Sequence, residues 1–546
     1  MKVVIVGGYG VFGSRLAELL LRDGHTVWLA GRDLEKAREC TKVIGGHPMA
    51  FDVRATPEKL FEPDPDIVID ATGPFQANEK YSYRIPRLCL DGGVDYLDLS
   101  DDAGFTAGIS TLDDDARKQG RRLLSGASSV PGLSSIVAAG LCRDFDEILL
   151  IDTVILPGNR APRGAAVIAS IVGQLGKSSP VWRGGVWRQQ RCWSERKRVS
   201  LAPDLIRTGY FIEVPDIRLF PDFFGARSVV FRAGMELGLL NMALRGLGVL
   251  RRIWPFKVSP GRVRFMQWCA NGLLRFGTDR GGMSVTVVGR KDTGFRQREW
   301  RMIAAAGDGP YIPCITARAL LRCLERVPPG ARPCLAELTL VEIEEAMSDL
   351  CVTTAVDETA RATLFQDSLG DQWSKLPPEV QDLHSVQDIE SFSGTAEVLS
   401  GKSLFARFLA RIFRFPAAGD DVPVTVTMTR TEYGEIWERS FDGRILRSHC
   451  TPAKAPHRYR ERFWLFNCEL DLLVEDGCMR LPVRRGWFAG LPLPRFLLPR
   501  SDSREYAQNG SFRFDVALSA PFGGGLLVRY RGYLRPDRRE PLPGGS

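Results

Sequence analysis

Residues 1–33 read MKVVIVGGYGVFGSRLAELLLRDGHTVWLAGRD, and they decide the fold. A short apolar run at residues 3–6 ends in glycines and leads directly into a helical pattern of leucines, so the order is strand, turn, helix. Gly8, Gly10 and Gly13 form the pattern G-x-G-x-x-G. The first glycine permits a tight turn, the second lets the backbone approach a pyrophosphate, and the third lets helix and strand pack closely. The stretch therefore predicts a dinucleotide site, with the pyrophosphate at the positive end of the helix.

The residues after the second predicted strand indicate which dinucleotide binds. That strand, at residues 26–30, is followed by Gly31 and Arg32, where a site for NAD usually carries Asp or Glu. A carboxylate there would repel a 2′-phosphate, whereas a guanidinium would pair with it. Arg32 therefore favours NADP as the cofactor, while Asp33, one position later, keeps NAD open.

The composition limits the other classes of function. The 546 residues predict two or three domains, and 44% hydrophobic with 25% charged residues is typical of a globular protein. Twelve cysteines without a C-x-x-C pattern and only five histidines favour neither a zinc site nor a disulfide framework. We therefore expect no metal site and a cytoplasmic protein. No apolar run has the length of a membrane span.

The positive charge is concentrated in one region. Residues 233–304 hold thirteen Lys and Arg against four Asp and Glu, an excess of nine that is larger than the net charge of +8 for the whole chain. A localised basic region indicates that this part of the surface meets a membrane, a nucleic acid or an acidic partner.

The first domain is predicted as α/β, an N-terminal Rossmann domain with a doubly wound parallel sheet, over residues 1–131. Its later strands are expected at residues 49–53, 66–75, 95–100 and 121–125. Asp52 stands where such a domain often touches the adenine, and the ligand belongs at the carboxyl ends of the strands.

Two further domains are predicted. Strand-like runs such as residues 148–156 and 283–289 indicate an α+β second domain over residues 132–346, of a substrate-binding or dimerisation type. A hydrophilic stretch with little periodicity, residues 348–362, serves as the next boundary. Alternating patterns then indicate a mostly β C-terminal domain over residues 362–536.

Several motifs resemble a known family. GGYGVFG, AGRD, ATGPF, DYLDLS and GASSVPG look like the saccharopine dehydrogenase-like, or saccharopine reductase-like, NAD(P)-dependent oxidoreductases over the first 140 residues, and more loosely to residue 346. The C-terminal part, with ARFLARIFRFP and LLVRYRGYL, resembles a bacterial domain family of unassigned function that is found fused behind such domains.

The resemblance implies a set of cofactor contacts. They lie in the glycine loop, after the second strand and in the turn near the nicotinamide ribose, at Gly8, Tyr9, Gly10, Val11, Phe12, Gly13, Arg32, Thr72, Gly73 and Pro74. The resemblance does not imply saccharopine as the substrate, because the substrate-binding arginines of that family find no match in this chain.

The group that would move a proton is less evident. Hydride transfer needs a proton donor or acceptor, and the only histidines before residue 346 are His25 and His47, both on the nucleotide half. Asp98 and Asp101 follow a strand whose carboxyl end faces the ligand, so burial could fit one of them for this role. Alternatively, these aspartates cap the next helix or face solvent.

A second hypothesis rests on an apolar, basic helix within residues 237–257. On a helix, Asn241, Arg245, Gly248 and Arg252 form one narrow polar stripe, and apolar side chains cover much of the remainder. Such a helix either lies in a membrane interface or is buried beneath another domain or the partner of a homodimer. Tryptophans and arginines alternate over residues 182–198, but no nucleic-acid module accompanies them, so no nucleic-acid partner is expected.

The leading hypothesis is an NADP-preferring oxidoreductase of the saccharopine dehydrogenase-like class. It would transfer a hydride to or from a C–N or C–O bond of a small or lipid-like substrate, in the cytoplasm, with membrane association left open. The alternative is a non-catalytic nucleotide-binding scaffold that docks on a membrane surface or a partner protein.

Overall fold

The computed structural model describes residues 1–73, 75, 83–162, 164–254, 259–292, 294–412, 415–521 and 525–537. The chain forms two compact units. The first consists of Met1–Trp182, Arg188–Lys291 and Arg296–Thr359, and the second of Arg183–Trp187, Asp292–Phe295 and Ala360–Ser546.

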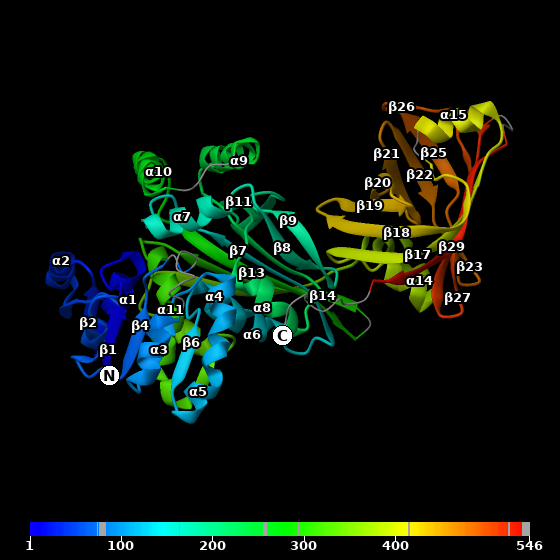
Figure 1. Ribbon diagram of the computed structural model, residues 1–546. Coiled ribbons are helices and arrows are strands. Elements are labelled where there is room, and N and C mark those ends of the chain that lie inside the picture. The colour runs from blue at the N-terminus through cyan, green and yellow to red at the C-terminus, as the bar shows by residue number, and fades with distance from the viewer. Residues whose placement is uncertain are drawn as a thin grey trace. The chain divides into compact units, whose positions relative to one another are not determined.

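A parallel sheet of seven strands opens the first unit (Figure 1). Its order is β15-β6-β5-β4-β1-β2-β3, with bounds Lys2–Val6 (β1), Thr26–Gly31 (β2), His47–Ala50 (β3), Ile67–Asp70 (β4), Asp95–Asp98 (β5), Arg122–Ser125 (β6) and Gly330–Pro333 (β15). The strand order reverses direction between β1 and β4, which is the point where a ligand binds in such folds. The predicted doubly wound sheet is confirmed.

Helices connect the strands of this sheet, except between β3 and β4, where the short 3-10 segment η1 (Pro57–Phe61) stands. They are α1 (Val11–Arg22), α2 (Leu34–Ile44), α3 (Arg84–Asp91), α4 (Ala103–Gly108) and α5 (Asp113–Lys118). Apolar positions of α1, such as Leu16 and Leu20, have no exposed surface, because they pack against the sheet.

All four later strands predicted for the first sheet are shorter in the structure, and hydrogen bonds mark where two of them end. The run at residues 66–75 ends as a strand at Asp70, because the Thr72 backbone N–H and hydroxyl both turn back to the Asp70 carboxylate. The strand expected at residues 49–53 is β3, which begins at His47 and ends at Ala50; Asp52 lies beyond it, and its Oδ1 accepts a hydrogen bond from the Arg54 backbone N–H.

The last strand of the first sheet comes from a distant segment. Residues 330–333, which the sequence places in the second domain, form β15 and pair in parallel with β6. The segment before β15, η7 (Gly309–Cys314) and α11 (Ile315–Arg322), packs on α1. There Arg318, which is 3% exposed, pairs with Asp23 and Asp349.

A mixed sheet forms the rest of the first unit, which confirms the α+β prediction. Its order is β10-β11-β12-β7-β13-β14-β16, with β8 and β9 off this path. The bounds are Glu147–Leu156 (β7), Ser178–Arg183 (β8), Val186–Arg191 (β9), Lys197–Ala202 (β10), Leu205–Phe211 (β11), Val229–Ala233 (β12), Gly281–Lys291 (β13), Gly294–Ala304 (β14) and Val352–Ala360 (β16). Trp182 and Trp193 are buried in this region, so they do not form a stacking surface.

Strand β16 differs from the expectation for its sequence. Residues 348–362 are predicted as a hydrophilic boundary, yet Val352–Ala360 is an edge strand beside β14. Its side chains are mostly exposed, and Glu358 and Asp357 pair with Arg298 and Arg301 of β14. The strand is thus held by backbone pairing and ion pairs. Because it buries few apolar side chains, its sequence lacks the apolar alternation by which a strand is predicted.

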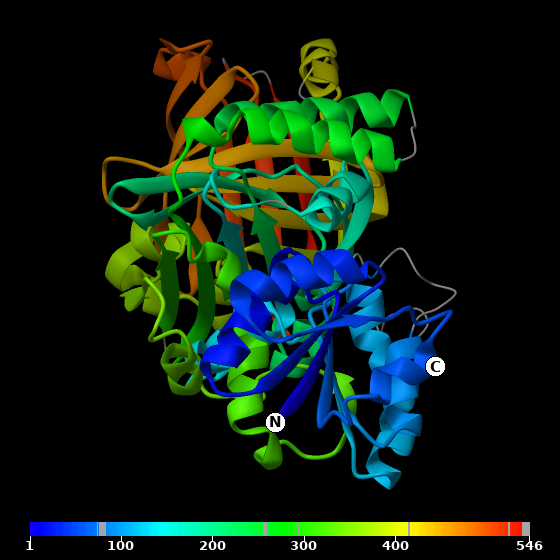
Figure 2. The ribbon, with the colours of Figure 1, turned by 90° about the vertical axis from the view of Figure 1, so that its left-hand side faces the viewer.

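Helices accompany the mixed sheet. They are α6 (Ser134–Cys142), α7 (Ala165–Gln174), α8 (Pro215–Phe224), α9 (Gly238–Ile253), α10 (Pro260–Gly272) and α12 (Leu340–Ala346). Of these, α6 packs on β13 and β7, and α8 packs on β12. Figures 1 and 2 show α9 and α10 on the same side of the first unit. Among the helices of the described ranges, none has both the length and the apolar character needed to cross a membrane.

The second unit is one antiparallel sheet, which confirms the mostly β prediction (Figure 1). Its main strands are β17 (Ile389–Ser400), β18 (Gly419–Thr431), β19 (Gly434–Phe441), β20 (Arg444–Pro452), β21 (Arg458–Phe463), β22 (Phe466–Asp471), β23 (Leu473–Glu475), β24 (Cys478–Arg480), β25 (Val483–Phe488), β27 (Arg500–Gln508), β28 (Ser511–Ser519) and β29 (Leu526–Pro536). Short helices α13 (Leu364–Leu369), α14 (Pro378–Leu383) and α15 (Leu404–Ile412) accompany it.

A single long hairpin closes this sheet into a barrel. Strand β22 pairs with β21, and only Leu472 separates it from β23, which stands at the other end of the strand order. In the returning arm, β25 pairs with β22 while β24 pairs with β27. The two arms therefore join both ends of the sheet, and the sheet surrounds an interior.

Candidate nucleotide-binding site

The glycine loop forms a cradle that leaves no room for side chains. A Cβ atom on Gly13 would lie 2.3 Å from the Gly7 carbonyl oxygen, and one on Gly8 would lie 2.8 Å from the Leu29 Cα. The Gly10 N–H donates to the Gly7 carbonyl at 2.9 Å, which closes the turn. Gly10 is the N-cap of α1 and has no side chain to bond the first helical N–H groups. These N–H groups are therefore the ones that a pyrophosphate would need.

Two residues of the loop fix α1 from the other side. Val11 lies close to the segment before α7, because a Cβ on Gly164 would be 3.3 Å from its Cγ2. The Phe12 carbonyl oxygen lies 3.3 Å from the Cys314 sulfur, which donates to it from the end of η7. The cradle is thus held by segments that are far apart in the sequence.

Arg32 and Asp33 both follow β2, but their side chains have different surroundings. Asp33 caps α2: its carboxylate accepts a hydrogen bond from the Lys36 backbone N–H at 3.2 Å and pairs with the Lys36 ammonium at 3.1 Å. That backbone hydrogen bond lowers the pKa of Asp33. Arg32 is exposed at the end of the strand. Tyr9 lies against Gly31, and its hydroxyl accepts from the Asp33 N–H at 3.2 Å.

The neighbouring strands contribute the next predicted residues. Asp52 follows β3 and is half-buried, and Thr72 and Gly73 follow β4. Thr72 donates through its N–H and its hydroxyl to Asp70 Oδ1, at 2.9 and 2.6 Å. Burial raises the pKa of Asp70, although these two hydrogen bonds oppose the shift. Pro74, also predicted as a cofactor contact, lies outside the described residues.

Asp98 ends β5 as a buried carboxyl group. Its Oδ1 accepts hydrogen bonds from the Gly126 N–H at 2.7 Å, the Ser100 N–H at 2.9 Å and the Ser125 hydroxyl at 3.0 Å. Burial raises the pKa of Asp98 to about 7, although these hydrogen bonds oppose the rise. A pKa near neutrality suits general acid–base chemistry. Yet the residue has no exposed surface, so its direct role is to hold the turn at Ser125 and Gly126.

Asp101 is placed differently. It lies half-buried on the loop between β5 and α4. The helix cap is Asp102, whose Oδ1 accepts from the Phe105 N–H at 2.7 Å. One alternative for Asp98 and Asp101 was that they cap the next helix. In the structure Asp102 caps α4.

The structure shows an aromatic cluster at this edge that was not predicted from the sequence. Tyr83 stacks on Phe105 with 4.8 Å between ring centroids, and Phe75 lies 5.0 Å from Phe105. The Tyr83 hydroxyl donates to the Phe105 carbonyl at 2.7 Å, and burial, with the nearby Asp98 and Asp102 carboxylates, raises the pKa of Tyr83 to about 12. No motif joins Tyr83 to Phe105, and only Phe75 stands in a motif, ATGPF.

No candidate metal site accompanies the nucleotide cradle. Within the part of the chain that the structure describes, His, Cys, Asp and Glu do not gather in any group of three or more that could hold a metal ion.

Two family models match the chain. Residues 3–123 match the saccharopine dehydrogenase NADP binding domain, and residues 376–534 match a domain of unknown function (DUF4166). The resemblance drawn from the sequence motifs is confirmed for both parts. The first match supports nicotinamide dinucleotide binding and an oxidoreductase.

Solved structures give distant matches. Saccharopine dehydrogenase (L-Glu forming) from Saccharomyces cerevisiae shares 12% identity, over 65% of this chain and 99% of that one, with a TM-score of 0.46. A protein described as a probable dehydrogenase from Thermotoga maritima shares 10% identity, over 66% of this chain and 98% of that one, with a TM-score of 0.33. These scores carry no conclusion about activity. No curated protein matches the chain.

Gly13→Ala tests the cradle. Because its Cβ would lie 2.3 Å from the Gly7 carbonyl oxygen, the loop or α1 must shift. We expect a loss of about 1–3 kcal/mol of stability and at least about tenfold weaker nicotinamide nucleotide binding. Urea denaturation and fluorescence titration measure these two effects. Gly246→Ala in α9, where nothing lies within 4 Å, is the control and should change neither value for the worse. Unchanged nucleotide binding by Gly13→Ala would contradict the cradle.

Asp98→Asn tests the buried carboxyl group. The pKa is about 7 in the folded protein against 3.8 for the unperturbed group, so over this range the folded state keeps a proton that the unfolded state has lost. Stability of the wild type should therefore fall as the pH rises through this window. The Asn variant keeps an acceptor but cannot ionise, so it should gain on the wild type by up to about 4 kcal/mol between pH 4 and pH 8.

Urea denaturation across this pH range measures the Asp98 effect. Asp216→Asn is the matched comparison, because burial also raises the pKa of Asp216 to about 7. The Asp216→Asn substitution should remove the part of the pH dependence of stability that Asp216 causes, and the part that Asp98 causes should remain. Parallel stability curves for Asp98→Asn and wild type would show that Asp98 does not titrate in this window.

Proposed function

We propose that the first unit binds NADP and catalyses hydride transfer to or from a C–N or C–O bond of a small or lipid-like substrate. The observation that carries the proposal is the glycine cradle, in which Gly8 and Gly13 have no space for a Cβ and α1 begins at the carboxyl end of β1. The match of residues 3–123 to an NADP binding domain supports the same ligand.

The preference for NADP over NAD rests on the residues after β2. Asp33 is engaged as the cap of α2, so its carboxylate is directed to its own helix. Arg32 is the exposed charge at the strand end, where its guanidinium would pair with a 2′-phosphate. Asp52 would lie near the adenine, and Thr72 with Gly73 near the nicotinamide ribose.

The cofactor would supply or accept the hydride, and the chain must place the substrate and move a proton. We assign the proton to Asp101, because it is accessible on the loop after β5. Asp98 acts through the turn that it holds and is a positioning residue. Tyr83, Phe75 and Phe105 would give the substrate an apolar surface at this edge.

A second candidate function, membrane contact, rests on α9. Leu239, Met242, Val249, Leu250 and Ile253 are between 53% and 77% exposed, so the apolar face of this helix points outward. The opposite face contains Asn241 and Gly248, which are buried, and Gly248 touches Gly176 just after α7. The predicted polar stripe is therefore divided: two of its members face the protein, while Arg245 and Arg252 stay exposed.

The neighbouring helix and the charge extend this surface. Phe265 and Trp268 of α10 are 63% and 72% exposed, and their rings stack. Residues 238–278 hold seven Lys and Arg and no Asp or Glu. We propose that α9 and α10 lie in the interface of a membrane that contains anionic lipids, where apolar burial and charge act together. A homodimer through the same face is the competing occupant.

Arg32→Ala tests the cofactor preference. Loss of the guanidinium should weaken NADPH binding about tenfold and leave NADH binding unchanged, because only NADPH carries the 2′-phosphate. Titration followed by nicotinamide fluorescence measures both constants, and fractionated cell extracts are then added to detect oxidation of NADPH. Arg38→Ala, an exposed arginine of α2 that pairs with Glu35, is the control. Failure of the folded wild type to bind either nucleotide would overturn the proposal.

Met242→Asp/Ile253→Asp tests the membrane surface. These side chains are 63% and 77% exposed, so the substitutions should leave the fold intact. Sedimentation with vesicles of phosphatidylcholine and phosphatidylglycerol should show at least about tenfold weaker binding than for the wild type. Val43→Asp on α2, which is 84% exposed, is the control and should bind normally. The proposal would be wrong if the wild type did not bind vesicles and sedimented as a dimer while the double variant sedimented as a monomer. That result would assign the face to a second copy of the chain.

A further inference from the structure

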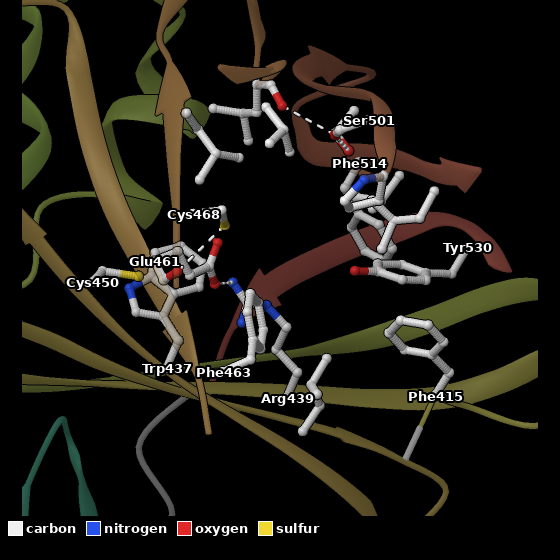
Figure 3. Close-up of a pocket in the computed structure, with 18 of the residues that line it drawn as sticks. Phe415, Trp437, Arg439, Cys450, Glu461, Phe463, Cys468, Ser501, Phe514 and Tyr530 are labelled. Atoms are coloured by element: carbon white, nitrogen blue, oxygen red, sulfur yellow. Dashed lines mark hydrogen bonds and ion pairs between the residues drawn. The ribbon is translucent and has the colours of Figure 1, made fainter. Parts of the chain in front are cut away.

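The barrel of the second unit encloses a cavity of about 760 Å³ (Figure 3). This volume falls within the range of about 300–1,000 Å³ that is typical of small-molecule sites. Protein interiors are normally filled to the density of organic crystals, with few voids larger than a water molecule. A space of this size is therefore a feature that the packing of the unit does not require.

The cavity is the interior of the barrel, because alternate residues of its strands line it. On β28 these are Phe512, Phe514, Val516 and Leu518, and the residues between them point to the outer face. The same alternation appears on β19, where Trp437, Arg439 and Phe441 line the cavity. Most lining residues are apolar, so the cavity favours an apolar occupant.

Two pairs of ionisable side chains stand in the wall, Arg439 with Glu461 and His384 with Glu505, whose Nε2 and Oε2 atoms lie 2.6 Å apart. Arg439 pairs with Glu461 at 3.0 Å and donates to the Ser448 hydroxyl at 2.9 Å, and Ser448 donates to Glu461 at 2.7 Å. The Tyr459 hydroxyl donates to the second oxygen of Glu461 at 3.2 Å. Burial lowers the pKa of Arg439, but the nearby Glu461 carboxylate outweighs it and the pKa is raised overall. The Arg439 guanidinium is thus already engaged by Glu461 and Ser448.

Neutral hydrogen-bonding groups reach the same space. The Tyr530 hydroxyl points into the cavity (Figure 3), and burial raises the pKa of Tyr530 to about 12, so the group remains a donor. The Ser501 and Ser503 hydroxyls lie 2.7 Å apart in the wall formed by β27, and the Ser501 hydroxyl donates to the Leu481 carbonyl at 3.0 Å, which leaves oxygen lone pairs to accept from an occupant. These groups suit a hydroxyl or a carbonyl on the occupant.

The rim of the cavity is apolar as well. Trp464, in the turn between β21 and β22, lines the cavity and is 75% exposed. Phe488, which ends β25, and Leu497 also line it and are partly exposed. An apolar entrance of this kind allows a water-insoluble molecule to pass from its surroundings into the barrel.

We propose that the barrel of the second unit binds one neutral lipid, an apolar chain that carries a hydroxyl or carbonyl group. A fatty-acid carboxylate is disfavoured, because it would bring a further carboxylate into a wall that already contains Glu461 and Glu505, while Arg439 is already paired with Glu461. This site is independent of the nucleotide cradle and of the proposed hydride transfer.

Competition on the unaltered full-length protein tests the ligand class. The neutral dye N-phenyl-1-naphthylamine is the probe, and dodecanol and dodecanoate compete with it at pH 8. We expect one saturable dye site and displacement by dodecanol at concentrations at least about tenfold lower than by dodecanoate. The absence of a saturable site, or equal or better displacement by dodecanoate, would overturn the proposal.

Two neighbouring substitutions on β28 locate the dye site. Val516→Trp fills the cavity and should weaken dye binding at least about tenfold, whereas Ala517→Trp places the same side chain on the outer face and should not. Thermal unfolding checks that both variants fold. Met242→Asp/Ile253→Asp should keep the dye site. Wild-type binding by folded Val516→Trp, or loss of binding in the α9 variant, would place the site outside the barrel and overturn the proposal. If Val516→Trp does not fold, the competition on the unaltered protein decides.

Discussion

The close approach of α1 to the end of β1 is the constraint on which the first unit depends. Gly13 makes it possible, since any side chain there would meet the Gly7 carbonyl. The same helix is then fixed from its outer side, where Tyr311 donates to Glu18 at 2.7 Å and Arg318 pairs with Asp23. The cradle and the segment that ends in β15 therefore share α1, and a shift of this helix would disturb both.

The sequence was sufficient for the features that depend on local patterns. G-x-G-x-x-G after a buried strand predicts the cradle, and the order of apolar runs predicts the parallel sheet. Features that depend on distant partners were missed. Residues 330–333 carry no apolar pattern, and they become a strand because β6 offers them a free edge. In β16 ion pairs and backbone bonds replace the alternation that a prediction needs.

The burial and orientation of single side chains could not be predicted from the sequence either. The position of Asp98 after a strand is readable, but its complete burial and its three hydrogen bonds follow from the turn at Ser125. The amphipathic pattern of α9 is readable too, yet it does not tell which face meets the protein. In the barrel, alternation identifies the residues that point inward. Whether their side chains fill the interior or leave a cavity depends on the number of strands around it.

Closure of the barrel has a consequence for the order of events during synthesis. The first long strand, β17, pairs with β29, the last, so that Phe392 lies opposite Pro536. Chains are made from the N-terminus, and units fold as their residues emerge. The first unit can therefore mature on the ribosome while the second waits for its final strand. During that interval β17 has an unpaired edge and the future cavity wall faces water, so this is the period in which the nascent chain is most exposed to aggregation or to a chaperone.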